Sequence, residues 1–404
     1  MGSGILTLNE TRSMSPTDAP LTGVRVVEMT EALAGPFCGM TLGDLGADVV
    51  KVERPGVGDQ ARKWGPPFLE GESAYFLSVN RNKRSIELDV KAAEDHQVLL
   101  ALLDRADVFI TNNPRMESLE RLGLDPKSLR TRSPKLIYAA ISGYGHTGAK
   151  AGRAGYDVIA QGESGLMALA GEPGSGPIRF PTAMADISAG LYALIGIQAA
   201  LYARDNRATG CGVGQFVDVA LVDAQLTWLA NIAGTYFATG ERPPKLGNAH
   251  PTIAPYQPVQ ARDKPLIVGI GTERLWASFC KVLGVEDTIM VDERFATNPE
   301  RNRHREVLIP LLEEVLARRD AEAWVQDLVA VGIPAGPINF VEEALTDEQI
   351  LSRRMVVELE HPAIGIVRSL ANPIHMSPAG PTYRRYPPRL GEHNDEIRAE
   401  LATC

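Results

Sequence analysis

Short β-branched runs alternate with helix-length segments between residues 24 and 142. Residues 24–29 read VRVVEM and are flanked by Gly23 and Thr30, which is typical of a buried strand. A helix is expected over residues 36–45, because Pro36 suits a first helical position and Gly46 suits a C-terminal stop. Residues 48–53 (DVVKVE) form the next expected strand, so the three segments predict a βαβ unit with parallel strands. The alternation continues with strands at 85–90, 107–111 and 136–142 and helices at 92–103 and 115–122, which predicts a doubly wound α/β domain.

The length and the changes in composition along the chain predict two domains. A chain of 404 residues exceeds the usual ~150 residues of one domain. Gly-rich loops and uncharged stretches follow residue 144, Arg- and Glu-rich amphipathic segments follow residue 246, and Gly and Pro return from residue 332. The predicted parts are a flexible N-terminal tail (1–20), a large Rossmann-like domain (21–225), a linker helix (226–245), a smaller α/β domain (246–330) and a C-terminal segment that packs back on the large domain (331–404).

Charge and cysteine content exclude several classes of protein. The chain has 41 Lys and Arg against 50 Asp and Glu, a formal charge of -9, and no basic block, so nucleic acid is not an expected partner. The four cysteines lie far apart and indicate reduced thiols, and the N-terminus lacks the apolar and basic segments of a signal peptide. A cytoplasmic location is therefore expected. The histidines lack metal-ligand spacing, so no metal site is expected.

Two uncharged stretches of 17 residues, 187–203 and 224–240, are long enough to raise the question of a membrane span. Their length is at the lower limit of the ~17 to 25 residues that a spanning helix needs, and both contain Gly with Gln or Asn. Two buried helices, and no membrane partner, are the prediction.

The first strand-to-helix turn reads EALAGPFCGM and lacks the G-x-G-x-x-G that binds the pyrophosphate of a dinucleotide, which disfavours an NAD enzyme. Cationic residues lie beside the next two expected strands instead: Arg54 follows the strand at 48–53, and Lys83 and Arg84 precede the strand at 85–90. Ligands of such sheets bind at the carboxyl ends of the strands, so these cations are candidates for the phosphates of an anionic ligand. A solvated surface charge is the alternative for each of them.

Asp186 is the only charged side chain between residues 180 and 203. Asp is a favoured N-cap, so a purely structural role at the start of an uncharged helix is one interpretation. A poorly hydrated carboxylate at a helix N-terminus is also suited to act as an oxygen nucleophile. Both interpretations stay open on the sequence alone.

Eight segments share their order and spacing with a known family: residues 34–59, 80–89, 141–145 (ISGYG), 155–173, the stretch around Asp186, 212–221 (GVGQFVDVAL), 247–259 (GNAHPTIAPYQPV) and 387–397 (PPRLGEHNDEI). They resemble the class III CoA-transferases, among which are formyl-CoA, carnitine and succinyl-CoA:malate CoA-transferases. The resemblance covers nearly the whole chain after residue 20. Within the family, the chain most resembles the CoA-transferases that act on dicarboxylates.

The resemblance implies a fold, an assembly and a mechanism. It implies a homodimer of two interlocked rings, each with a Rossmann-like large domain that binds CoA. It implies that Asp186 attacks the acyl-CoA thioester to give a mixed anhydride, and that the CoA thiolate then forms an aspartyl-CoA thioester, which the incoming acid resolves. Acyl-CoA and a carboxylic acid are then the substrates, with succinyl-CoA and malate as the expected pair, and no tightly bound cofactor or metal is required.

The resemblance also places CoA contacts on eight positions: Ala32, Leu33, Ala34, Arg54, Leu88, Lys91, Asn112 and Arg121. Leu33 replaces a glutamine of the formyl-CoA enzymes, which argues against formate as the acceptor. The glycine run of those enzymes is also missing, and Gly269 and Gly271 stand in the comparable place as candidate substrate contacts.

Two alternatives and four further substrate contacts complete the expectations. Related racemases use a histidine thirty residues before the aspartate, where this chain has Tyr156. An unperturbed tyrosine with a pKa near ~10 is a poor base at neutral pH, which disfavours racemisation. Tyr144, Tyr156, Arg179 and His250 are candidates for binding the acyl group or a distal carboxylate. The chain is alternatively one subunit of a heteromeric CoA-transferase.

Overall fold

The computed structural model describes residues 19–206 and 208–403, so the predicted tail lies almost wholly outside the described residues. The chain divides into two compact units. The first contains the residues up to 167, residues 179–234 and the residues from 347 onwards; the second contains residues 168–178 and 235–346. These boundaries differ from the sequence-based ones: residues 168–178 group with the second unit, and the C-terminal segment is divided at residue 347.

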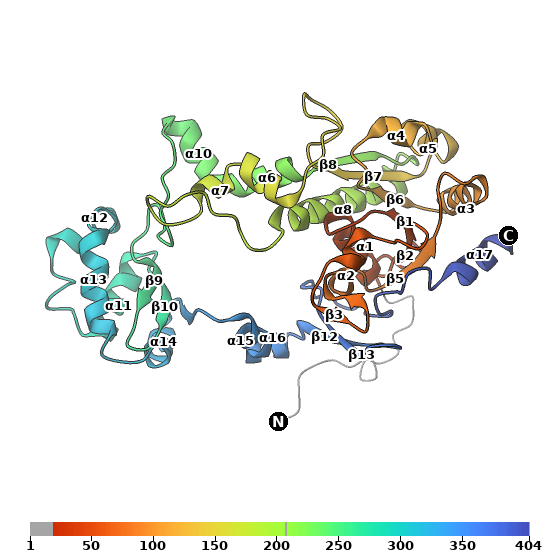
Figure 1. Cartoon of the computed structure of the whole chain (residues 1–404). Helices are drawn as coiled ribbons and strands as arrows, with labels where there is room; N and C mark the ends of the chain where they lie inside the picture. Colours follow the sequence, from red (N-terminus) through yellow and green to blue (C-terminus); the bar gives the residue numbers. More distant parts are fainter. Residues whose placement is uncertain (1–18, 207, 404) are drawn as a thin grey trace. The chain divides into compact units, whose positions relative to one another are not determined.

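A six-stranded parallel sheet forms the centre of the first unit (Figure 1). Its spatial order is β5 (Lys83–Glu87), β2 (Asp48–Glu53), β1 (Arg25–Met29), β6 (Val108–Thr111), β7 (Ile137–Ser142) and β8 (Phe216–Ala220). This order is that of the doubly wound nucleotide-binding folds, and it reverses between β1 and β6. The five sequence-predicted strands are all present, whereas β8 was not predicted. The carboxyl ends of β1 and β6 therefore flank the crevice in which such folds bind ligands.

Helices cover both faces of the sheet because neighbouring residues of each strand point to opposite faces. Val26 packs in the same cluster as α1 (Ala34–Asp44) and α8 (Met184–Asp205), whereas Val27 packs with α3 (Ala93–Asp104), α5 (Pro126–Arg132) and α17 (Asn394–Ala402). This unit also contains α2 (Ala74–Ser78), α4 (Met116–Glu120), α6 (Asp157–Glu163), α9 (Leu221–Leu226), α16 (Glu348–Ser352) and the short strands β3 (Phe68–Leu69) and β4 (Glu72–Ser73).

The two uncharged stretches fold differently from each other. α8 is long and apolar enough to cross a membrane, but half of its most apolar window is buried within the protein, against α1, β7 and β8. The second stretch was predicted to be one buried helix, and this prediction is wrong. It is divided into α9, a 3₁₀ turn at Thr227–Leu229 and α10 (Ala230–Thr239), and α10 has no buried residue. The predicted linker helix is therefore interrupted, and the boundary between the units falls inside α10.

The second unit is built on a three-stranded antiparallel sheet in the order β11 (Ala335–Pro337), β10 (Pro265–Gly269) and β9 (Tyr256–Gln260). Its core contains Leu266 and Val268 of β10 and Trp276 and Phe279 of α11 (Glu273–Leu283). Further helices are α12 (Asn298–Arg303), α13 (Arg305–Leu316), α14 (Ala321–Ala330) and α15 (Val341–Thr346), and the short helix α7 (Leu166–Leu169) contains the boundary between residues 167 and 168.

The last part of the first unit is a hairpin of β12 (Val356–His361) and β13 (Gly365–Leu370), followed by an extended run and α17. It is joined to the start of β5 by side-chain hydrogen bonds. Arg81 Nη1 donates to Ser369 Oγ at 2.7 Å and to the Leu370 carbonyl at 2.8 Å. Arg84 donates to Glu400 Oε1 of α17 at 2.7 Å. Chain segments about three hundred residues apart thus share one edge of the parallel sheet.

Candidate active site

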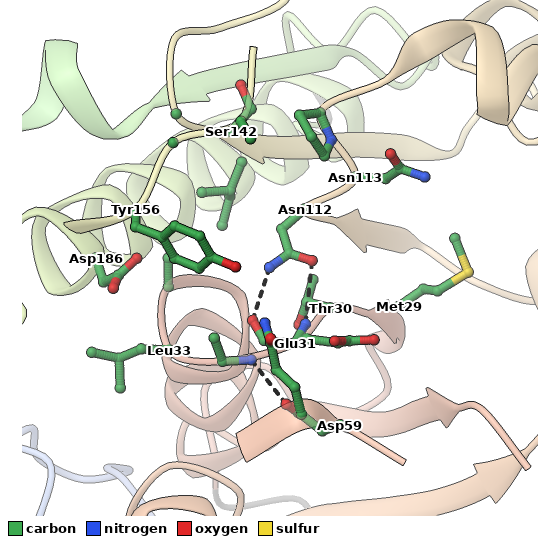
Figure 2. A pocket seen from close by; sticks show the side chains of 18 of the residues that line it. Met29, Thr30, Glu31, Leu33, Asp59, Asn112, Asn113, Ser142, Tyr156 and Asp186 are labelled. Carbon is green, nitrogen blue, oxygen red and sulfur yellow. Dashed lines mark hydrogen bonds between the residues drawn. The ribbon is translucent and has the colours of Figure 1, made fainter. Parts of the chain in front are cut away.

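A pocket of about 1340 Å³ opens at the carboxyl ends of the central strands, and all of its lining residues belong to the first unit (Figure 2). It is lined by the segments that follow β1, β2, β6 and β7, by residues 154–158 around the start of α6, and by residues 179–187 at the start of α8. The pocket therefore lies at the place where the strand order reverses, as expected for this sheet topology.

Ten of the seventeen candidate residues named from the sequence line this pocket: Ala32, Leu33, Ala34, Arg54, Leu88, Lys91, Asn112, Tyr156, Arg179 and Asp186. Arg121 does not line it; its Nε donates to the Glu117 carbonyl of its own helix at 3.2 Å. Tyr144 does not line it either, and its hydroxyl donates to Glu163 Oε1 at 3.0 Å. His250, Gly269 and Gly271 belong to the second unit.

Asp186 lies in the first turn of α8 but is not its N-cap. The N-cap is Ala183, whose side chain makes no capping hydrogen bond. A different carboxylate caps the N-terminus of α8, because the Ala185 N–H donates to Asp157 Oδ1 at 2.8 Å. The capping interpretation of Asp186 is therefore wrong, and its carboxylate is left for another role.

The Asp186 carboxylate has no hydrogen bond or ion pair to any described residue. Each of the other carboxylates that line the pocket has a partner. The pairs are Glu31 with Arg54, Glu53 with Arg62, Asp59 with Lys51, Asp89 with the Lys91 N–H, and Asp157 with Gln161. Burial, which leaves the charged form poorly hydrated, and secondly the negative charge of Asp157 together raise the pKa of Asp186 to about 7. Asp186 is thus an uncommitted, weakly solvated carboxylate in the pocket.

The turn between β1 and α1 is held open toward the pocket by side chains from two other segments (Figure 2). Ala32 has φ 70°, a left-handed conformation that is unfavourable for a residue with a Cβ. Its N–H donates to Asp59 Oδ1 at 2.9 Å. Asn112 accepts from the Glu31 N–H at 3.2 Å and donates to the Glu31 carbonyl at 2.8 Å. These bonds fix the backbone of the turn from which the predicted CoA contacts Ala32, Leu33 and Ala34 project.

Ion pairs within the first unit account for two cations that were phosphate-binding candidates. Lys83 is fully buried, and its Nζ lies 2.8 Å from Glu28 Oε2. Arg84 is paired with Asp48 at 2.6 Å and faces α17. Both residues begin β5 and are therefore at the end of the sheet away from the ligand crevice. Both interpretations of Lys83 and Arg84 are therefore wrong, because the two side chains are neither in the pocket nor solvated but buried in ion pairs.

Four cations do line the pocket: Arg54, Lys91, Arg115 and Arg179. Arg54 forms an exposed ion pair with Glu31 at 3.0 Å. Arg179 donates from Nε to the Phe180 carbonyl and from Nη2 to the Pro181 carbonyl, both at 3.0 Å, and it has no carboxylate partner among the described residues. Arg115 was missed from the sequence, although it follows the predicted strand that ends at Thr111, at the carboxyl edge of the sheet. The pocket therefore offers several positive charges to an anionic ligand.

Comparisons with known proteins show the family of this chain. A sequence model of CoA-transferase family III matches residues 21–394. The chain belongs to CoA-transferase family III. The succinate–glutarate CoA-transferase of Agrobacterium fabrum is 42% identical over 390 residues, which are 95% of this chain and 96% of that protein. The human succinyl-CoA:glutarate CoA-transferase is 37% identical over 382 residues, covering 95% of this chain and 86% of that protein.

A solved structure of the family also matches. The crystal structure of a CAIB/BAIF family protein from Brucella suis has a TM-score of 0.84 and 42% sequence identity, and the match covers 95% of this chain and 100% of that one. This family III CoA-transferase therefore has the mixed α/β fold with a parallel sheet that the sequence predicted. As a CoA-transferase it acts on a CoA thioester and a carboxylic acid.

Proposed function

We propose that this enzyme transfers CoA from succinyl-CoA to a free dicarboxylic acid, with Asp186 as the nucleophile. The observation that carries the proposal is the Asp186 carboxylate, which lines the pocket of a family III CoA-transferase and is bonded to no described residue. The substrate class rests on the two relatives described above, which are named for succinate or succinyl-CoA and for glutarate.

The proposed reaction proceeds through two kinds of covalent intermediate. The Asp186 carboxylate attacks the thioester carbonyl, the C–S bond breaks, and CoA leaves as a thiolate from a mixed anhydride. The thiolate attacks the aspartyl carbonyl, which releases succinate and leaves an aspartyl-CoA thioester. The acceptor carboxylate attacks this thioester to give a second anhydride and the thiolate. The thiolate then attacks the acceptor's carbonyl, which releases the new CoA ester and regenerates Asp186.

The pocket supplies what these steps require. Asp186 lies in the first turn of α8, where the positive end of the helix dipole favours the ionised carboxylate. The turn at residues 32–34 and the neighbouring Arg54, Lys91 and Asn112 surround the space proposed for CoA. Leu33 lies in this turn in place of a hydrogen-bonding glutamine, which disfavours a small polar acceptor such as formate.

Arg179 is proposed to bind the distal carboxylate of the dicarboxylate. Its two backbone hydrogen bonds orient the guanidinium, and it lies seven residues before Asp186 in a segment that lines the same pocket. Arg–carboxylate hydrogen bonds are charge-assisted and directional, which suits selection of a second carboxylate.

The test is a chromatographic assay of CoA esters after incubation of the enzyme with succinyl-CoA and one free acid at a time. Glutarate, malate and mesaconate form the dicarboxylate set, and formate and butyrate form the monocarboxylate set. We expect a new CoA ester from at least one dicarboxylate with the native enzyme and none with Asp186→Asn. Turnover of monocarboxylates without any turnover of dicarboxylates would overturn the substrate class.

We also propose a homodimer of interlocked rings. Leu191, Ile195 and Tyr202 lie on one face of α8 at helical spacing and are 42%, 58% and 71% exposed in the single chain. A row of exposed apolar side chains on the helix that carries the nucleophile is typical of a surface covered by another subunit.

A further inference from the structure

Two side chains of the short helix α6 form hydrogen bonds to α8 and to the segment that leads into it. Asp157 Oδ1 accepts a hydrogen bond from the Ala185 N–H at 2.8 Å, in the first turn of α8. The other carboxylate oxygen, Oδ2, accepts from Gln161 Nε2 at 2.8 Å. Asp157 and Gln161 are four residues apart and therefore lie on one face of α6. Through Asp157, this face accepts a hydrogen bond from the N–H of Ala185, the residue before Asp186.

Gln161 also holds the segment that leads into α8. Its Oε1 accepts from the Phe180 N–H at 2.9 Å, and its Nε2 donates to the Thr182 carbonyl at 3.1 Å. The side chain is 1% exposed, so both ends of the amide are satisfied by protein groups rather than by solvent. Arg179 is attached to the same segment through the carbonyls of Phe180 and Pro181. One buried amide thus connects the backbone around Arg179 with the cap of the helix that carries Asp186.

We propose that Asp157 and Gln161 are positioning residues for CoA transfer, which hold Asp186 at a fixed place relative to Arg179 and keep a negative charge beside the nucleophile. The inference rests on the proposed role of Asp186. Neither residue is required to touch the substrate for this role, because both act through the backbone of residues 180–185. A displacement of about 1 Å in such a frame is enough to reduce a rate by about 10²-fold.

The charge of Asp157 has a second effect, which separates this role from a purely structural one. Two titratable side chains interact electrostatically with Asp186: Asp157 from α6 and Tyr75 from α2. Burial raises the pKa of Tyr75 to about 12, so Tyr75 is neutral over the working range of pH. Asp157 is therefore the charged neighbour, and it acts with burial to raise the pKa of Asp186. Removal of this charge is expected to lower the pH at which Asp186 becomes ionised.

The test compares three variants with the native enzyme. Asp157→Asn keeps an oxygen that can accept from the Ala185 N–H but removes the charge. Gln161→Ala removes the amide but keeps both carboxylates. Asp125→Asn is the matched control, because Asp125 caps α5 by accepting from the N–H groups of Lys127 and Ser128 and does not line the pocket. For each protein, kcat and KM for succinyl-CoA are measured from pH 5.5 to 9 with one dicarboxylate, together with the melting temperature.

We expect Asp157→Asn to move the acidic limb of the kcat/KM profile to lower pH, and we expect no such movement in Asp125→Asn. Gln161→Ala should lower kcat by about 10²-fold at every pH, because Asp186 is no longer held in its position relative to Arg179. An unmoved acidic limb in Asp157→Asn, or a Gln161→Ala variant that loses melting temperature but keeps kcat, would overturn the proposal.

Two controls keep the outcome interpretable. If Asp157→Asn does not fold, Gln161→Ala decides alone, since an unchanged kcat in that variant contradicts the positioning role. If the native enzyme shows no transfer, or if Asp186→Asn is as active as the native enzyme, the proposed function has failed instead. An active native enzyme with inactive Asp186→Asn, combined with unaltered Asp157→Asn and Gln161→Ala variants, rejects the positioning role only.

Discussion

Asp186 illustrates how a buried carboxylate can lower the stability of the protein that contains it. Burial raises its pKa from 3.8 to about 7, so the folded protein binds this proton more tightly than the unfolded chain does. Between these two pH values the contribution of Asp186 to the free energy of unfolding therefore falls as the pH rises. At pH 8 the group is ionised in both states, and its poor hydration in the folded state is fully unfavourable.

The prediction is that Asp186→Asn increases the free energy of unfolding by about 1 to 3 kcal/mol at pH 8. The increase should disappear as the pH is lowered to about 4, where the native carboxyl is protonated in the folded state. Urea unfolding at the two pH values measures both. An equal difference at pH 8 and pH 4 would show that burial of the charge is not its cause.

Arg179 gives a prediction about substrate selection. Arg179→Met should raise KM for the dicarboxylate acceptor by about 10- to 100-fold, because a charge-assisted hydrogen bond to the distal carboxylate is lost. KM for succinyl-CoA should rise too, since its acyl group carries a free carboxylate, whereas KM for a monocarboxylate should change little. Initial-rate measurements with each acid decide this. An equal loss for both kinds of acid would remove Arg179 from selectivity.

Single residues differ in how far sequence alone reveals their role. Asp186 stands out because its surroundings in the sequence are apolar, and that contrast survives folding. Lys83 and Arg84 looked like ligand-binding cations because the sequence does not show that Glu28 and α17 reach them. The sequence analysis did not single out Asp157 and Gln161, although they lie four residues apart in a short helix that precedes Asp186 in the chain.

At the scale of the element, the turn between β1 and α1 combines a left-handed residue with a buried carboxylate. Ala32→Gly removes the Cβ and should leave stability equal or slightly higher. Ala32→Val places a β-branched residue at φ 70° and should cost about 1 to 2 kcal/mol of stability. It should also raise KM for succinyl-CoA, because the turn carries proposed CoA contacts. Unfolding and KM measurements on both variants check this; an unaffected Ala32→Val would contradict it.

The buried ion pairs under this turn make a separate prediction. Lys51 contacts both Glu28 and Asp59 at 2.9 Å, and Lys83 contacts Glu28. Lys83→Met leaves buried negative charge without one of its partners and should cost about 3 to 5 kcal/mol of stability.

The matched control for Lys83→Met is Arg132→Met, which breaks the ion pair between Arg132 and Asp104. The side chain of Arg132 is 44% exposed and that of Asp104 is 41% exposed. An exposed pair of this kind should cost no more than about 1 kcal/mol. Urea unfolding of both variants compares them. Equal losses would show that the buried network has no special importance.

At the scale of the whole molecule, the exposed apolar face of α8 predicts the assembly. The native enzyme should have twice the chain mass in analytical ultracentrifugation. Ile195→Glu together with Tyr202→Glu should shift it toward the monomer, because the two glutamates would place unpaired charge in the contact between subunits. A native monomer at micromolar concentration would contradict the dimer. A native dimer without transferase activity would favour the heteromeric alternative, in which a related second subunit is needed.

The overall organisation was only partly predictable, and the reason is physical. Local periodicity predicted the strands at 24–29 and 48–53 to within about one residue, since a buried parallel strand is apolar wherever it lies. β8 was missed, because its residues are only partly buried and include Asp218. The two compact units differ from the predicted domains because residues 168–178 accept hydrogen bonds from the Gly247 N–H and from Lys245, which are distant in sequence.

The central claim, that Asp186 carries the transferred group, is tested most directly by mass spectrometry. The native enzyme is incubated with succinyl-CoA without an acceptor, quenched in acid and digested, and the peptide that contains Asp186 is weighed. The account predicts a CoA thioester on Asp186 in the native enzyme, its loss when an active dicarboxylate is added, and no adduct in Asp186→Asn. Transfer to a dicarboxylate with no adduct on Asp186, or with an adduct on another residue, would contradict it.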